Sequence, residues 1–264
     1  MEVLPYNDRF KGADWLKEME YFSHSIIGLG GIGSHLSFQL ARAGAKNLSL
    51  YDDDMVENHN IGGQLFSSQQ VGDSKVFATK QIIEMLVSPE QGTKIYSNVR
   101  QTLSPMFQRF SNSALFCCVD NMTSRRKLAE DFKRKLEGVT NNNSRVSVDK
   151  IYFESRLSPT GFEIFCLRND KESEIDFYLE NCLFTDEQAT GLSCSFKQTT
   201  HVAAALASKL VTIYTNYLTN IALNKGEKDS VRTNVDFFPV PFYYREDCNL
   251  LTKEINQDVT TYGK

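Results

Sequence analysis

Three glycines, Gly28, Gly30 and Gly33, have the G-x-G-x-x-G spacing of a loop that binds phosphate. Such a loop lets the backbone approach a phosphate closely, and the N–H groups at the start of the following helix face its negative charge. Asp52 ends the next apolar run, where a carboxylate can accept hydrogen bonds from ribose hydroxyls. The spacing therefore predicts a nucleotide site, although glycines that only make tight turns would give the same pattern.

Short apolar runs place this loop in a βαβ unit. Residues 25–27 predict a strand before the loop, residues 34–43 a helix after it, and residues 47–51 a second strand. Residues 113–119 form an apolar run that ends at Asp120, as is typical of a strand buried on both faces of a parallel sheet. Ligands bind at the carboxyl edge of such sheets, so we expect Asp120 near the loop.

The remaining elements extend this unit. A helix is expected over residues 74–86, and a polar stretch over residues 138–144 marks a surface loop. Next we expect a hairpin, an irregular charged crossover and a long apolar helix, at residues 146–167, 168–193 and 200–223. The segment 235–238 and then a polar tail follow the helix. The predicted fold class is α/β: a Rossmann-like, mostly parallel sheet with helices on both faces, plus a C-terminal extension of hairpin, crossover and long helix.

Composition narrows the class of protein. The 264 residues are 41% hydrophobic and 23% charged, as in ordinary globular proteins, and the net charge of -4 disfavours nucleic acid as a partner. No apolar run reaches the ~18 residues of a membrane span and the N-terminus lacks a signal pattern, so we expect a cytoplasmic protein with no membrane partner. The six cysteines contain no C-x-x-C pair, so we expect free thiols and no zinc site.

One family shares the order of five features of this sequence: residues 28–34, residues 51–60, residues 71–76, the Asp120-Asn121 pair and Arg125. Over roughly residues 5–225 the chain resembles the ThiF/MoeB/ubiquitin-activating-enzyme-like adenylyltransferases, in a form similar to stand-alone bacterial or phage-borne members. The resemblance implies a homodimer. It also implies one domain over residues 1–264, divided into a nucleotide-binding half (1–145) and a carrier-binding and crossover half (146–264).

The resemblance also implies a reaction. The family joins the C-terminal carboxylate of a ubiquitin-like or sulfur-carrier protein ending in Gly-Gly to the α-phosphorus of Mg-ATP, and a protein accelerates such a step by positioning and charge neutralisation. ATP and Mg²⁺ are the implied cofactors, with Asp52 at the ribose, Asn60 and Lys75 at phosphates, and Asp120 at the metal. The other implied nucleotide contacts are Gly28, Gly30, Gly31, Gly33, Asp54, Gln64, Asn121 and Arg125. Taken singly, Lys75 could be a solvated lysine and Asp120 a helix N-cap.

One position departs from the family pattern. Gly63 stands where the family usually carries an arginine, so a guanidinium at the β- or γ-phosphate is missing there. Arg9 resembles the N-terminal arginine that family dimers supply across the subunit interface, and Arg125 follows Asp120 closely in the sequence. Either could substitute, although a surface position is common for arginine.

Cys194 is the candidate nucleophile. Residues 191–200 resemble the cysteine segment of the shorter activating enzymes, and a thioester requires an accessible thiolate. Helix dipoles and Lys197 could lower the pKa of Cys194, and His201 could assist as a base. Cys194 could equally be an inert buried thiol, and His201 a satisfied interior group.

The predicted function is adenylation of a carrier protein, which leaves a thioester, a thiocarboxylate or an amide open as the product. A degenerate family member that binds nucleotide and protein without catalysis is one alternative, and an NAD-dependent oxidoreductase is another. The aromatic residues 237–244 are interpreted as core or interface, with strand addition of a carrier tail as a second use.

Overall fold

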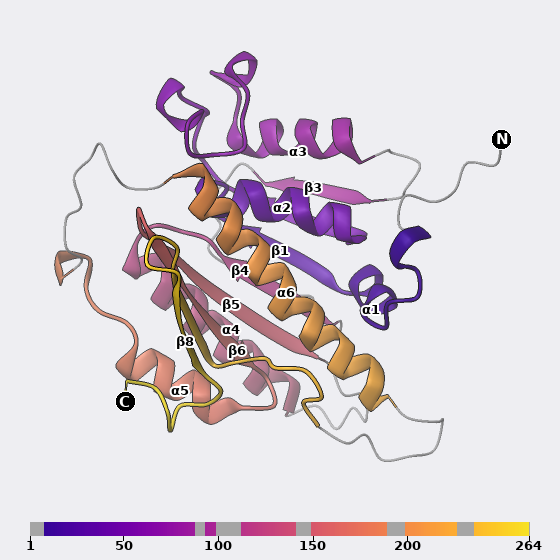
Figure 1. Cartoon of the computed structure of the whole chain (residues 1–264), viewed down its shortest axis with the longest axis vertical. Coiled ribbons are helices and arrows are strands. Elements are labelled where there is room, and N and C mark those ends of the chain that lie inside the picture. Colours follow the sequence, from indigo (N-terminus) through magenta and orange to yellow (C-terminus); the bar gives the residue numbers. More distant parts are fainter. Residues whose placement is uncertain are drawn as a thin grey trace.

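A computed structural model describes residues 8–87, 93–98, 112–140, 149–188, 199–225 and 235–263. These residues form an eight-stranded sheet in the order β3-β2-β1-β4-β5-β6-β7-β8 (Figure 1). The pairs from β3 to β5 are parallel and those from β5 to β8 are antiparallel, which confirms the mostly parallel sheet. The strands are β1 Ser23–Ile27, β2 Asn47–Tyr51, β3 Lys94–Asn98, β4 Ser113–Cys117, β5 Lys150–Leu157, β6 Gly161–Arg168, β7 Tyr243–Asp247 and β8 Thr252–Asn256.

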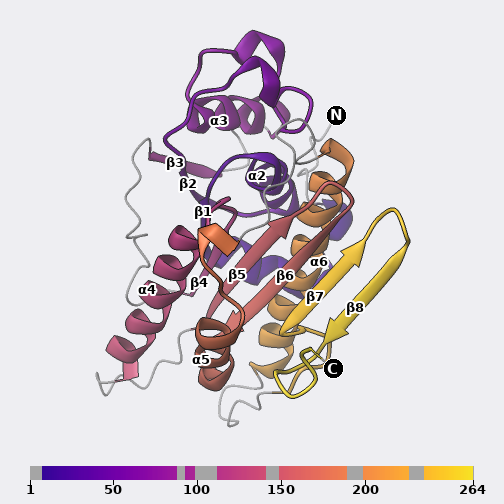
Figure 2. The same cartoon turned by 90° about the vertical axis from the view of Figure 1, so that its left-hand side faces the viewer.

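Helices cover both faces of this sheet, as predicted (Figure 2). One face packs against α1 Trp15–Tyr21, α2 Gly31–Ala43, α3 Lys75–Leu86 and α6 Thr200–Asn224. The other packs against α4 Met122–Thr140 and α5 Glu172–Asn181. Within the described residues, no helix combines the length and the apolar character that crossing a membrane requires.

The parallel register brings separate parts of the chain to one edge. Ile27 at the end of β1 pairs with Tyr51 at the end of β2 and with Cys117 at the end of β4. The residues that follow these three strands therefore lie next to one another at the carboxyl edge of the sheet. The turn after β5 lies at the same edge, because β5 is parallel to β4.

The predicted irregular crossover was wrong over part of its length. Residues 172–181 form α5, because Ile175 and Tyr178 have helical spacing and are buried against the sheet. The charged residues between them hid this apolar face.

The predicted polar tail was also wrong in part, because it contains the hairpin of β7 and β8. Phe242 and Tyr244 are buried, as the core interpretation of the aromatic residues requires, whereas Phe237 and Phe238 are exposed. Strand β7 is paired on both sides, so strand addition in this region has only the outer edge of β8 available.

Candidate nucleotide site

Two glycines of the loop between β1 and α2 have no room for a side chain. A Cβ on Gly28, whose φ is +87°, would lie 2.7 Å from the carbonyl oxygen of Cys118. A Cβ on Gly33 would lie 1.8 Å from the carbonyl oxygen of Gly28. The nearest atom to a Cβ on Gly30 would be Gln64 Nε2, at 3.9 Å, so the space in front of this glycine is open. The loop is thus tightly packed at Gly28 and Gly33 and open to a ligand at Gly30.

The start of α2 presents amides that no side chain caps. Gly30 is the N-cap residue, and no side chain of the described chain accepts a hydrogen bond there. Ser34, one turn into the helix, donates its hydroxyl to the carbonyl oxygen of Gly30 and accepts the amide of Leu65. The first amides of the helix therefore remain available to an anion, with the helix dipole behind them.

Asp52 lies against the glycine loop, as the sequence predicted. Its Oδ2 accepts the amide of Leu29 at 2.6 Å and its Oδ1 accepts the amide of Asp54 at 2.8 Å. Burial raises the pKa of Asp52 despite these two amide hydrogen bonds and the nearby Lys75. Each carboxylate oxygen can accept a further hydrogen bond, so the contacts with the loop are compatible with a role at the ribose.

Lys75, the first residue of α3, forms an ion pair with Asp54. The pair lies next to an isolated β-bridge between Met55 and Ser74. The buried Lys75 places its Nζ 2.7 Å from Oδ2 of the exposed Asp54, and its amide donates to the Asp54 carbonyl. Asp52, Asp53 and Asp54 bring their carboxylates within 4.8 Å of one another, which offers oxygen ligands for a cation. The Lys75 ammonium neutralises part of that charge.

Asn60 and Gln64 belong to one turn, and the Gln64 side chain is the nearest group to the open side of Gly30. Asn60 Oδ1 accepts the amide of Glu57, and the Asn60 carbonyl accepts the amides of Gly63 and Gln64. Gln64 Oε1 is buried and has no hydrogen-bond partner among the described residues, so it can accept a donor from a ligand. An unpaired buried acceptor beside an open glycine fits a nucleotide, which carries amino and hydroxyl donors.

Asp120 and Asn121 connect β4 to α4 at the same edge. Asp120 is exposed and has a weak contact with its neighbour, from Asn121 Nδ2 at 3.4 Å. Asn121 is the side chain that caps α4 locally, because its Oδ1 accepts the amide of Ser124. The Asp120 carboxylate is therefore accessible at this edge of the sheet, and its binding of a metal ion stays a prediction.

Arg125 is buried beneath this turn. Its guanidinium donates to the carbonyl oxygens of Val119 and Ser155 and forms an ion pair with the fully buried Glu154. In this arrangement Arg125 supports the turn. Its Nε has no hydrogen-bond partner among the described residues, and the nucleotide contact of Arg125 stays a prediction.

No hydrogen bond or ion pair among the described residues joins Arg9 or His201 to the residues above. Arg9 is exposed in the short 3-10 turn Asp8–Phe10, and His201 is exposed in the first turn of α6. Cys194 and Lys197 fall outside the described residues. Of the described cysteines, all but Cys248 are buried. Burial raises the pKa of Cys118 to about 12 and that of Cys182 to about 11.

Two residues of this region were missed by sequence reasoning. Asp186 accepts hydrogen bonds from α4 although 63 to 64 residues separate it from its partners, so no local pattern indicates it. Glu154 carried a signal, because a carboxylate inside the apolar run of β5 implies a buried cation nearby.

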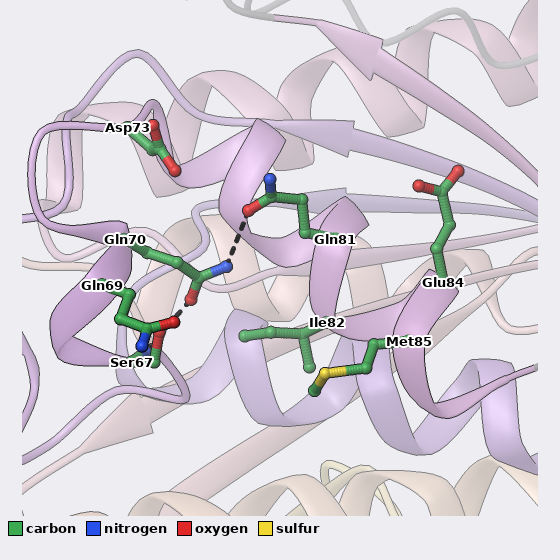
Figure 3. Close-up of a pocket in the computed structure, with 8 residues that line it drawn as sticks. All are labelled: Ser67, Gln69, Gln70, Asp73, Gln81, Ile82, Glu84 and Met85. Atoms are coloured by element: carbon green, nitrogen blue, oxygen red, sulfur yellow. Dashed lines mark hydrogen bonds between the residues drawn. The ribbon is translucent and has the colours of Figure 1, made fainter.

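A surface hollow of about 460 Å³ lies on the outer side of α3 (Figure 3). Gln70 crosses its floor, donating to Gln81 Oε1 and accepting the amide of Ser67. Met85 and Glu84 line the rim. None of the predicted site residues lines this hollow, so it is separate from the glycine loop.

The fold is that of the nucleotide-binding α/β proteins, with a glycine loop at the carboxyl edge of a parallel sheet. The chain belongs to the ThiF family, whose model matches residues 7–249. Ubiquitin-like modifier-activating enzyme 5 of Gallus gallus is 31% identical over 121 residues, which are 41% of this chain and 30% of that protein. The Mus musculus protein of the same name is 29% identical over 122 residues, 41% of this chain and 30% of its own length. The chain thus matches less than a third of these relatives.

Solved structures share the fold over most of the chain. E. coli MccB crystallised with ATP has a TM-score of 0.61 at 14% identity, covering 97% of this chain and 72% of MccB. PaaA has a TM-score of 0.62 at 16% identity, covering 94% of this chain and 68% of PaaA. The E. coli tRNA N6-threonylcarbamoyladenosine dehydratase TcdA has a TM-score of 0.56 at 15% identity, covering 82% of this chain and 94% of TcdA. These likenesses establish the fold.

Proposed function

We propose that this protein is an adenylyltransferase that activates a C-terminal carboxylate with Mg-ATP. The observation that carries the proposal is the uncapped start of α2 behind a glycine loop, with Asp52, Lys75 and Asp120 brought to the same edge of the sheet. Membership of the ThiF family, the resemblance to ubiquitin-like modifier-activating enzyme 5 and the MccB structure with ATP support it.

Each residue of the site would have a separate role in binding Mg-ATP. The amides of Gly31 and Gly33 would hold phosphate oxygens, and Asp52 would bind the ribose with lone pairs that the loop amides leave unused. Lys75 would exchange Asp54 for a phosphate oxygen, and Asp120 would hold Mg²⁺, which neutralises phosphate charge. The carboxylate oxygen of the substrate then bonds to the α-phosphorus while the bond from that phosphorus to pyrophosphate breaks.

The relatives support a proposal for the substrate class. A ubiquitin-like or sulfur-carrier protein, ending in Gly-Gly, is proposed because of the modifier-activating relatives. Passage of the acyl group to Cys194 belongs to the same proposal. Replacing Cys194 by Ala should leave ATP–pyrophosphate exchange intact and remove any thiol-sensitive adduct with the carrier, and an adduct that persists would exclude this residue.

Pyrophosphate exchange tests the principal proposal. Wild-type protein with ATP, Mg²⁺ and candidate carriers should incorporate labelled pyrophosphate into ATP, and Asp120→Ala should lower the rate by about a hundredfold or more. Silence of the wild type with every carrier, while ATP still binds, would contradict catalysis.

A second candidate is a family member that binds nucleotide and a protein without catalysis. It is favoured by Gly63 in place of the family arginine and by the engagement of Arg125 with Glu154 and with the carbonyl oxygen of Ser155. Tight ATP binding without exchange, and a biological effect that survives Asp120→Ala, would support this candidate.

A further inference from the structure

Asp186 binds the start of α4 from a distant part of the chain. It opens the 3-10 turn Asp186–Gln188, which follows α5. Its Oδ1 accepts the amide of Met122 at 2.6 Å, and its Oδ2 accepts the amide of Thr123 at 3.3 Å and the hydroxyl of Thr123 at 2.6 Å. The contact therefore joins the connection after α5 to the turn between β4 and α4.

The first turn of α4 is fully hydrogen-bonded as a result. Asn121 accepts the amide of Ser124, and Asp186 accepts the two amides before it. On the other side of the turn, Arg125 holds the carbonyl oxygen of Val119. Asp120 thus sits between two anchored neighbours, while its own carboxylate stays exposed.

We infer that Asp186 is a positioning residue for Asp120: its carboxylate fixes the turn after β4 so that the Asp120 carboxylate is held in place for Mg²⁺. This inference rests on the proposed function. The alternative is that Asp186 only stabilises α4. That helix, however, is already anchored by Leu128, Ala129 and Phe132 in the core, whereas the Asp186 side chain is exposed and adds no burial.

The chain provides a matched control. Asp258 caps a turn with the same chemistry, because its Oδ1 accepts the amide of Thr260 at 2.9 Å and its hydroxyl at 2.6 Å. Hydrogen bonds from a threonine hydroxyl and from backbone amides lower the pKa of both Asp186 and Asp258. Asp258→Ala therefore removes a similar cap away from Asp120.

The experiment measures pyrophosphate exchange of the full chain as a function of Mg²⁺ concentration. Asp186→Ala should raise the Mg²⁺ concentration for half-maximal rate about fivefold, the size that loss of a helix cap gives. Asp186→Asn, which keeps an acceptor, should lie between this variant and the wild type. Asp258→Ala should have the wild-type Mg²⁺ dependence.

Two further measurements separate positioning from stability. Thr123→Ala should add little to the shift in the Asp186→Ala background, because the two side chains form one unit. Amide hydrogen exchange at Met122 and Thr123 should be faster in Asp186→Ala. This readout needs no activity, so it tests the contact even if the wild type is inactive and the proposed function fails.

Faster amide exchange with an unchanged Mg²⁺ dependence would overturn the inference. So would a rate that falls equally at all Mg²⁺ concentrations together with the thermal midpoint, because that pattern is purely structural. A shift as large in Asp258→Ala as in Asp186→Ala would overturn it as well.

Discussion

The glycines of the phosphate loop differ in what surrounds them. Substitution at one should therefore affect ATP binding, and substitution at another should affect the stability of the fold. Gly33 packs against the Gly28 carbonyl, whereas Gly30 faces open space. A methyl group at Gly33 must displace the backbone of Gly28. A methyl group at Gly30 enters the space where a ligand phosphate would lie.

Gly30→Ala should weaken ATP binding about tenfold or more, because the methyl group disturbs charge-assisted amide contacts. Its free energy of unfolding should stay within about 1 kcal/mol of the wild type. Gly33→Ala should instead destabilise the protein by about 3 kcal/mol or more. Calorimetric ATP titration and urea unfolding measure the two effects.

Gly62→Ala is the control for this pair, since a Cβ there meets no atom within 4 Å. It should leave unfolding close to wild type. ATP binding that is unchanged in Gly30→Ala would contradict the placement of phosphate at α2.

His24 should make stability depend on pH. Burial lowers its pKa to about 4 from 6.5, against an opposing hydrogen bond to Asn47. The ring is neutral in the folded protein, with one nitrogen at the Asn47 carbonyl and the other at the Tyr214 hydroxyl. The unfolded chain binds the proton first as the pH falls, so this contribution is complete above about pH 6.5 and is lost towards pH 4.

From pH 7.5 to pH 5, His24 should cost the wild type about 2 kcal/mol of unfolding free energy. His24→Asn keeps a donor for the Asn47 carbonyl and does not titrate, so it should lack this loss. Urea unfolding of both proteins at the two pH values measures the difference. Equal losses would show that His24 does not titrate as its burial requires.

Among single residues, those placed by a local pattern could be predicted from the sequence. Gly28, Gly33 and Asp52 lie within one βαβ unit, so spacing was sufficient to bring them together. Arg125 and Asp186 could not be placed in this way, because their partners come from other elements and depend on how α4 packs against β5.

Between elements, a buried ion cluster joins α4 to β5. Glu154 has no exposed surface and accepts both Arg125 and Arg156. Glu163, on the neighbouring strand β6, also lies near Arg156, at 3.7 Å, but is partly exposed. The same arginine is therefore paired once in the interior and once near solvent.

Glu154→Gln should lower the free energy of unfolding by about 3–5 kcal/mol, because it leaves the buried Arg125 guanidinium without a counter-charge, whereas Arg156 keeps Glu163. Glu163→Gln, the matched control, should cost no more than about 1 kcal/mol, as for exposed pairs. Chemical denaturation at neutral pH measures both. Similar values for the two variants would contradict the importance of burial here.

Elements with a strong apolar period were predicted well. The strands β1 and β2 and the helices α3 and α6 lie within a few residues of the expected ranges. Helix α5, strand β3 and the β7–β8 hairpin were missed, because their polar residues interrupt the period and their apolar side chains become evident only when packed.

At the scale of the whole molecule, the expected homodimer makes a specific prediction. Arg9 is exposed on a short turn, and the stacking of Phe10 on Trp15 ties that turn to α1. If Arg9 acts in the partner's site, Arg9→Ala and Asp120→Ala should each be inactive alone. Mixed and re-equilibrated in equal amounts, they should recover about a quarter of wild-type exchange activity, since half the dimers are mixed and each restores one site.

Analytical ultracentrifugation of each variant controls for assembly in this mixing experiment. A mixture that stays as inactive as its components, while both variants dimerise and exchange subunits, would show that Arg9 does not act across an interface.

The helices α2 and α4 begin at the same edge of the sheet, but their N-terminal amides differ in whether a side chain already accepts their hydrogen bonds. The Asp186 carboxylate accepts the first amides of α4, whereas no side chain of the described residues accepts the first amides of α2. A multivalent oxyanion should therefore bind at the N-terminus of α2 in preference to the N-terminus of α4. Sulfate and pyrophosphate should compete with ATP for the N-terminus of α2 more strongly than chloride at equal ionic strength, so the identity of the salt matters in any affinity measurement.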